Sequence, residues 1–206
     1  MILSELLSTL LQLAAFALIP FVVFVAQSRS AKGFWRYVGL YRAPGAAIGL
    51  ALLASVAFVS GNLGLALANP AIKVTMLDPH SETGHLRQLG LSPATVAVLL
   101  LMALGKTSLA EEILFRGFVA KRLMAAWGYR VGNLAQALLF GALHIGLFWS
   151  MKPGALFLGF AFAVAGVAAY FAAYLNERRA GGSIVPGWLA HGLANVVSYA
   201  VVAFVL

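Results

Sequence analysis

Residues 93–120 read PATVAVLLLMALGKTSLAEEILFRGFVA, an apolar run that continues without a break into a segment with four charged side chains. A membrane-spanning helix needs about 20 predominantly apolar residues. An ionisable side chain at the centre of such a helix costs on the order of 2.5–3.5 kcal/mol, so it is retained there for a reason. The stretch therefore predicts a membrane helix that carries functional charge at membrane depth.

The composition of the whole chain also favours a membrane protein. Of its 206 residues, 62% are hydrophobic and 10% are charged, against roughly 25% charged in a soluble domain, and the mean hydropathy is +0.94. We therefore expect a single integral-membrane domain over 1–206, with no second soluble domain. The expected fold class is all-α, a polytopic transmembrane helix bundle of about six spans with a polar cavity inside, or up to about eight spans if 93–127 divides.

Polar connections separate the six expected spans, and the third span begins with the helix-start signal Ser92-Pro93. Nine Lys and Arg residues lie in alternate connections, at 28–44, 117–130 and 176–183, and three lie in the others, around 70–92 and 150–153. This bias predicts that the first set is cytoplasmic and that both chain ends face the opposite side. The spans are expected at 6–26, 45–68, from 94 onward, 131–149, 154–175 and 184–206.

The second expected span is rich in Gly and Ala. Gly45 and Gly49 are four residues apart, the spacing that lets two helices approach closely. Because this spacing is common in polytopic bundles, we expect the pair to pack within the chain rather than to form a dimer face.

Charge and cysteine usage exclude several other classes of protein. The net charge is +8, but the basic residues are dispersed among apolar segments instead of forming one stripe, so we expect no nucleic-acid partner. The chain has no cysteine, which excludes disulfides, thiolate metal sites and a thiol nucleophile.

Three groups of polar residues interrupt three different apolar segments, and the first is Glu111-Glu112-Ile-Leu-Phe-Arg116. Glu112 and Arg116 are four apart and share a helical face, where a carboxylate and a guanidinium can pair. Glu111 is rotated by about 100° and can face a different cavity. If both glutamates only packed the bundle or flanked a helix end, the ion pair would account for one carboxylate and leave the other unexplained.

The other two groups contain histidines. His144 lies inside an apolar run, in Phe140-Gly-Ala-Leu-His144, and either a functional role or a hydrogen bond to a carbonyl or hydroxyl would account for it. His191 and Asn195 are four apart and offer hydrogen-bond donors toward a common point. Hydrogen bonding between helices is the alternative role for Asn195.

Together these groups supply what peptide hydrolysis requires. A carboxylate in apolar surroundings can take a proton from water with the help of an imidazole, a role that fits Glu111 and His144. The carbonyl oxygen that becomes negative needs fixed donors, a role that fits His191 and Asn195. The pair of Glu112 with Arg116 would then support the helix.

The ordered pattern Glu-Glu-x-x-x-Arg, Phe-x-x-x-His and His-x-x-x-Asn resembles the CPBP family of CAAX-type prenyl endopeptidases and bacteriocin-processing proteins, also called the ABI family. The motifs cover 111–195, and the family-like catalytic core is expected over about 93–206. The resemblance implies an intramembrane endopeptidase. It also implies catalytic roles for Glu111, His144, His191 and Asn195, with Glu112 and Arg116 in support.

Metal dependence has two interpretations. Glu111, His144 and His191 are a legitimate zinc ligand set, and the family is often described as metalloproteases. However, the motif His-Glu-x-x-His is missing and the two histidines come from separate helices. We therefore favour a mechanism in which the glutamate acts as the base without a firmly implied cofactor, with zinc as the alternative.

The expected partners are the lipid bilayer and a membrane-associated protein or peptide substrate, for which a prenylated C-terminal tail is the namesake of the family. The expected location is the bacterial inner membrane, as a multi-pass protein. A non-enzymatic partner that binds peptide tails in immunity or sorting is the main alternative function. A small proton-coupled transporter is a second alternative, because intramembrane Glu, His and Arg also mark ion pathways.

Overall fold

The stretch 93–120 forms one unbroken helical rod in the computed structural model, which describes residues 1–206. Ser92 Oγ accepts a hydrogen bond from the Thr95 N–H, and Pro93 occupies the first turn of α6, as the helix-start signal predicts. α6 passes directly into two π-helical stretches, η1 and η2, and then into α7. The region 93–127 therefore does not divide into two spans.

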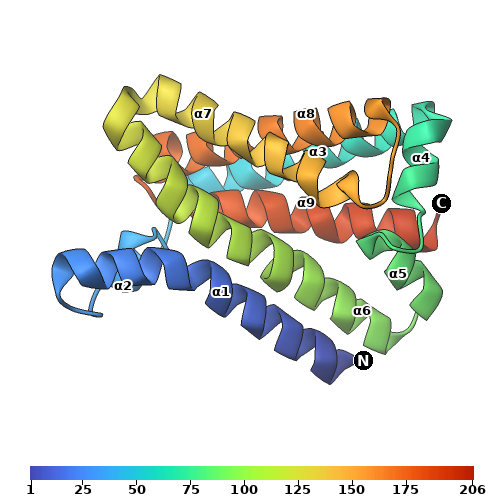
Figure 1. Ribbon diagram of the computed structural model, residues 1–206, viewed down its shortest axis with the longest axis horizontal. Helices are drawn as coiled ribbons and strands as arrows, with labels where there is room; N and C mark the ends of the chain where they lie inside the picture. The colour runs from blue at the N-terminus through green and yellow to red at the C-terminus, as the bar shows by residue number, and fades with distance from the viewer.

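The rest of the chain is also helical, without a strand. Figure 1 shows α1 and the rod of α6, η1 and η2 running side by side below the other long helices. In chain order the elements are α1 (Ile2–Ser28), α2 (Phe34–Tyr37), α3 (Gly45–Ala68), α4 (Pro70–Met76), α5 (Glu82–Leu89), α6 (Pro93–Leu100), η1 (Leu101–Leu109), η2 (Glu112–Ala120), α7 (Lys121–Trp149), α8 (Ala155–Tyr174), η3 (Leu175–Arg179) and α9 (Val185–Phe204).

Five helical segments are long and apolar enough to cross a membrane, and one of them, Pro93–Trp149, has 57 residues. This segment reverses at Gly128, whose φ of +75° lies in the left-handed region that favours glycine. The reversal produces two antiparallel legs, which are visible at the upper left of Figure 1. An architecture of about six spans, as predicted, is therefore compatible with the structure.

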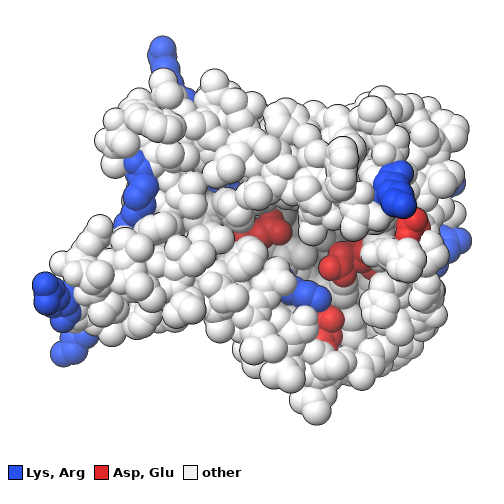
Figure 2. Space-filling view, viewed as in Figure 1, with Lys and Arg blue, Asp and Glu red and all other residues white.

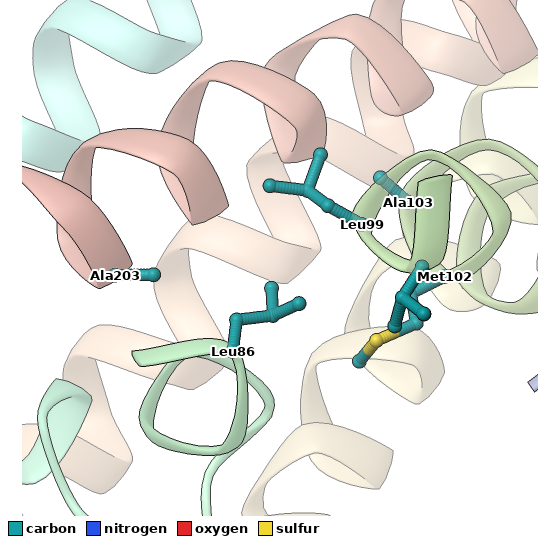
Figure 3. Close-up of a cluster of buried hydrophobic side chains, with 6 residues drawn as sticks. Leu86, Leu99, Met102, Ala103 and Ala203 are labelled. Carbon is teal, nitrogen blue, oxygen red and sulfur yellow. The ribbon is translucent and has the colours of Figure 1, made fainter. Parts of the chain in front are cut away.

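The polar connection 69–91 folds into the two short helices α4 and α5. Leu86 of α5 packs into a buried cluster with Leu99 of the rod and Ala203 of α9, shown in Figure 3. Lipid tails are as apolar as leucine, so close packing rather than exclusion of water holds such a contact in a bilayer. The cluster joins the start of the rod to the end of α9.

The leg that carries His144 is held by α8. Ala165 and Ala169 of α8 pack against Ala137 and Phe140 of α7. Small side chains at such an interface let the helix backbones approach closely. This packing fixes the turn of α7 directly before His144.

The three basic connections meet at one end of the bundle. The Tyr41 hydroxyl donates to the Gly181 carbonyl over 2.7 Å, and Lys121 Nζ lies 2.6 Å from Glu177 Oε1. Figure 1 shows these connections on the left, whereas both termini lie on the right. The connections thus alternate between the two ends, as the distribution of Lys and Arg requires.

The expectation for Gly45 and Gly49 is wrong. A Cβ at either position would meet no atom within 4 Å, and both residues are exposed. The inner face of α3 is formed instead by Ala47, Ala51 and Ser55, which are buried. The rotation of α3 about its axis therefore turns these alanines, and not Gly45 and Gly49, toward the neighbouring helices.

Single cysteines in this cysteine-free chain test the sidedness of the bundle. Ala31→Cys lies in a basic connection and Ser150→Cys lies at the other end, and both positions are exposed. Following the positive-inside rule, a membrane-impermeant maleimide should label Ala31→Cys only in inside-out vesicles and Ser150→Cys only in intact spheroplasts. Labelling of both variants from the same side would contradict the topology.

Candidate active site

A buried ion pair lies in η2, the last part of the rod. Arg116 Nε is 3.3 Å from Glu112 Oε1, and the two side chains are 2% and 0% exposed. The Arg116 guanidinium also lies over the Phe140 ring, with Cζ 4.0 Å from the centroid. The predicted pairing of Glu112 with Arg116 is confirmed, and the aromatic face gives the cation a second favourable contact.

Glu112 has a second partner that the sequence analysis did not identify. Asn176 Nδ2 donates to Glu112 Oε2 over 3.3 Å, and both residues are buried. One carboxylate oxygen therefore faces Arg116 and the other faces Asn176. Each oxygen of Glu112 thus has a contact, although Oε1 accepts no hydrogen bond, and Glu111 contacts neither Arg116 nor Asn176.

Glu111 lies at the junction of η1 and η2 and faces α9. Its Oε2 atom is buried, has no hydrogen-bond partner and is 3.9 Å from His191 Nε2. His191 Nδ1 in turn lies 3.7 Å from Glu112 Oε1. The imidazole thus lies between the two carboxylates, and both distances are slightly longer than a direct hydrogen bond.

His144 approaches the same region from α7. Its Nδ1 is 2.9 Å from the Phe140 carbonyl oxygen. Because a carbonyl can only accept, Nδ1 carries the proton and Nε2 keeps a lone pair in the neutral ring. No hydrogen bond or ion pair joins His144 to Glu111, but His144 lies within electrostatic range of Glu111 and His191.

Asn195 follows His191 by one turn of α9 and contacts η1. Its Nδ2 donates to Thr107 Oγ1 over 3.1 Å and to Ser108 Oγ over 3.3 Å. The Thr107 hydroxyl itself donates to the Met102 carbonyl five residues earlier. This contact is typical of a widened π-helical turn, a feature that often occurs at functional sites.

A second charged pair accounts for Lys106, another intramembrane charge of the rod. Lys106 Nζ is 3.2 Å from Glu5 Oε1 of α1, and the Lys106 carbonyl accepts a hydrogen bond from Gln12. Glu82 of α5 lies nearby. Its pKa is raised, because loss of hydration raises it more than the charge of Lys106 lowers it. Figure 2 shows acidic and basic side chains in a hollow near the middle of this face, whereas the other basic side chains lie toward its edges.

The structure places the six predicted residues on three helical segments, the rod, α7 and α9. Four of them are in direct contact: Glu111, Glu112, Arg116 and His191. The residues that sequence reasoning missed are Asn176, Thr107 and Ser108. Asn176 precedes Glu177-Arg178-Arg179 and resembles a polar connection in the sequence, and no periodicity marks it as buried.

The zinc set considered from the sequence does not form a ligand cluster. No three His, Asp or Glu side chains lie close enough together to hold a metal ion. A zinc ion held by Glu111, His144 and His191 would need the three side chains brought to about 2.0–2.2 Å from one centre.

Comparison with known families gives one finding. A family model described as type II CAAX prenyl endopeptidase Rce1-like matches residues 92–197, which is more than half of the chain and includes all six site residues. Comparisons with curated proteins and with solved structures found no match.

Removal of Arg116 tests the buried ion pair. Arg116→Ala should lower the free energy of unfolding by about 3–5 kcal/mol, because Glu112 then stays buried without its cation. Unfolding in detergent micelles, followed by heating and by denaturant, measures this change.

The matched control is Arg179→Ala, an exposed arginine whose Nε donates to the Tyr174 hydroxyl over 2.8 Å. It should change stability by less than about 1 kcal/mol. The double variant Arg116→Met/Glu112→Leu removes both charges and should recover most of the loss. Equal stability of Arg116→Ala and Arg179→Ala would show that the pair is not a structural requirement.

Proposed function

Because the chain belongs to the Rce1-like family of type II CAAX prenyl endopeptidases, an intramembrane protease family, we propose that Glu111 activates the water that cleaves a peptide bond. One observation carries this proposal: Glu111 Oε2 is buried without a hydrogen-bond partner and contacts only His191 as an ion pair, whereas Glu112 also contacts Arg116 and Asn176. A carboxylate without a partner in a water-poor site is available to accept a proton.

The proposed reaction proceeds through a tetrahedral intermediate. Glu111 takes a proton from the water molecule while the water oxygen attacks the carbonyl carbon of the peptide bond. The π electrons of the carbonyl group then move onto the carbonyl oxygen. His191 and Asn195 stabilise this oxyanion, with Asn195 exchanging its 3.3 Å contact to Ser108 for the new acceptor. The proton then passes to the amide nitrogen, the C–N bond breaks, and an amine and a carboxylic acid leave.

His144 and the ion pair have supporting roles in this proposal. The free Nε2 of His144 would accept a hydrogen bond from the attacking water and orient it toward Glu111. The Arg116 cation is occupied by Glu112 and the Phe140 ring, so it does not neutralise Glu111.

The substrate is a membrane-associated protein or peptide. We propose that its scissile bond lies close to a lipid-anchored end, such as a prenylated C-terminal tail, because the site is built from membrane-spanning helices. The proposed setting is the inner membrane of a bacterial cell, with the basic connections in the cytoplasm as the positive-inside distribution predicts.

Isosteric replacement of the base tests the function. Glu111→Gln keeps the shape of the side chain but accepts no proton, so cleavage of a fluorogenic farnesylated peptide in liposomes should fall at least about 100-fold. His144→Ala should also abolish cleavage while the protein still inserts into the membrane.

A comparison of membrane-peptide fragments from cells that carry the native chain with those from cells that carry Glu111→Gln would identify the natural substrate.

Glu177→Gln is the matched control, because it makes the same substitution at a glutamate that lies at the end of the bundle and pairs with Lys121. It should retain activity close to that of the native chain. Full proteolysis by Glu111→Gln or His144→Ala would refute the assigned roles.

We further propose that catalysis needs no zinc. Purified protein should contain well under one zinc per chain, and dialysis against a chelator should leave the cleavage rate unchanged. Elemental analysis and activity before and after zinc is restored are the measurements, with Glu111→Gln as the inactive reference. Stoichiometric zinc whose removal and return tracks activity would overturn the metal-free mechanism.

A further inference from the structure

Asn176 lies at the point where three helical elements approach the ion pair. The side chain is 1% exposed and occupies the start of η3, directly after α8. The two polar atoms of its amide contact different elements: Oδ1 accepts from the Gly187 N–H over 2.8 Å, and Nδ2 donates to Glu112 Oε2 over 3.3 Å. Asn176 thus bridges the rod and the first turn of α9.

The contact with α9 satisfies a backbone donor that the helix cannot satisfy itself. α9 begins at Val185, whose N–H donates to Ser183 Oγ over 3.3 Å, whereas the N-cap residue Ile184 provides no side-chain acceptor. The first N–H groups of a helix have no partner within the helix. In this buried position, the Asn176 carbonyl provides the cap for Gly187 from a distant part of the chain.

The approach is so close that position 187 has no space for a side chain. A Cβ on Gly187 would lie 2.7 Å from Asn176 Nδ2 and 2.7 Å from Glu112 Oε2. Real Cβ atoms do not tolerate this separation, so either the carboxylate or the amide would have to move. The glycine is therefore part of the contact between α9 and the ion pair.

Gly187 precedes His191 by four residues, so the two positions lie one above the other on the same face of α9. A fixed backbone at Gly187 therefore fixes the position of His191 along the α9 axis and its rotation about that axis. Glu112, the other partner of Asn176, lies 3.7 Å from His191 Nδ1. The amide consequently controls both the helix that carries the imidazole and a carboxylate beside it.

We propose that Asn176 is a positioning residue that sets His191 relative to Glu111 through Gly187 and Glu112. This proposal rests on the proposed function, because it assigns a catalytic consequence to the position of His191. Asn176 makes no contact with the reacting atoms. Its removal should impair the chemical step more than substrate binding, since misplacement by about 1 Å can cost up to about 100-fold in rate.

The chain offers a matched control in Asn133. This asparagine is also fully buried, and its Nδ2 donates to the Tyr170 carbonyl over 3.2 Å, joining α7 to α8. It contacts none of the six site residues. Asn133→Ala therefore reports the cost of losing a buried interhelical amide without disturbing α9.

The test compares Asn176→Ala, Gly187→Ala and Asn133→Ala with the native chain in liposomes, using the farnesylated fluorogenic peptide. We expect the first two to lower kcat by about 10- to 100-fold with KM nearly unchanged, and Asn133→Ala to keep kcat. If Asn176→Ala does not fold, Gly187→Ala carries the comparison, because it leaves the amide in place. A kcat for the variant used that equals the kcat of Asn133→Ala would overturn the proposal.

A second readout does not depend on cleavage. The chain has four histidines, so ¹⁵N-histidine labelling in micelles gives few ring signals, and His191→Gln identifies those of His191. Asn176→Ala should shift the His191 ring signals, whereas Asn133→Ala should not. Unshifted signals would overturn the positioning role even if activity is lost. If the native chain cleaves no faster than Glu111→Gln while the signals shift, the proposed function fails and the positioning role stands.

Discussion

The carboxylate of Glu112 and the guanidinium of Arg116 are both removed from solvent inside a bundle made to sit in lipid. Each charge alone would be expensive at this depth, and each is tolerated because the other neutralises it. The Phe140 ring adds a contact to the cation, and the Asn176 amide adds a hydrogen bond to the carboxylate. With those groups occupied, the neighbouring Glu111 keeps an unpartnered oxygen next to His191.

The same pair organises the elements around it. The rod contributes both charges, α7 contributes the aromatic face, and η3 contributes the amide that reaches on to α9. Membrane helices gain little from burying apolar side chains against one another. Polar contacts and close-fitting small residues such as Ala165 and Ala169 therefore decide which helices are neighbours.

The sequence predicted the helical class, the approximate spans and the ion pair, because hydropathy and the spacing of Glu112 and Arg116 depend on local geometry alone. Contacts between distant segments were harder to predict. Lys106 pairs with Glu5 across about 100 residues of chain, and Asn176 reaches Gly187 only after α8 and α9 have docked. The face of α3 was wrong because the rotation of a helix with small residues on several sides is set by its neighbours.

The reversal at Gly128 limits the insertions and deletions that the two legs beside it can tolerate. Glu111 lies 17 residues before Gly128 and His144 lies 16 residues after it, on antiparallel legs of nearly equal length. One inserted or deleted residue in either leg would shift the part of the helix that follows it by about 1.5 Å along the helix axis and rotate that part by about 100°. Substitutions of lipid-facing side chains in the two legs have a much smaller effect. The number of residues between Glu111 and His144 is therefore a stricter requirement than the identity of those lipid-facing residues.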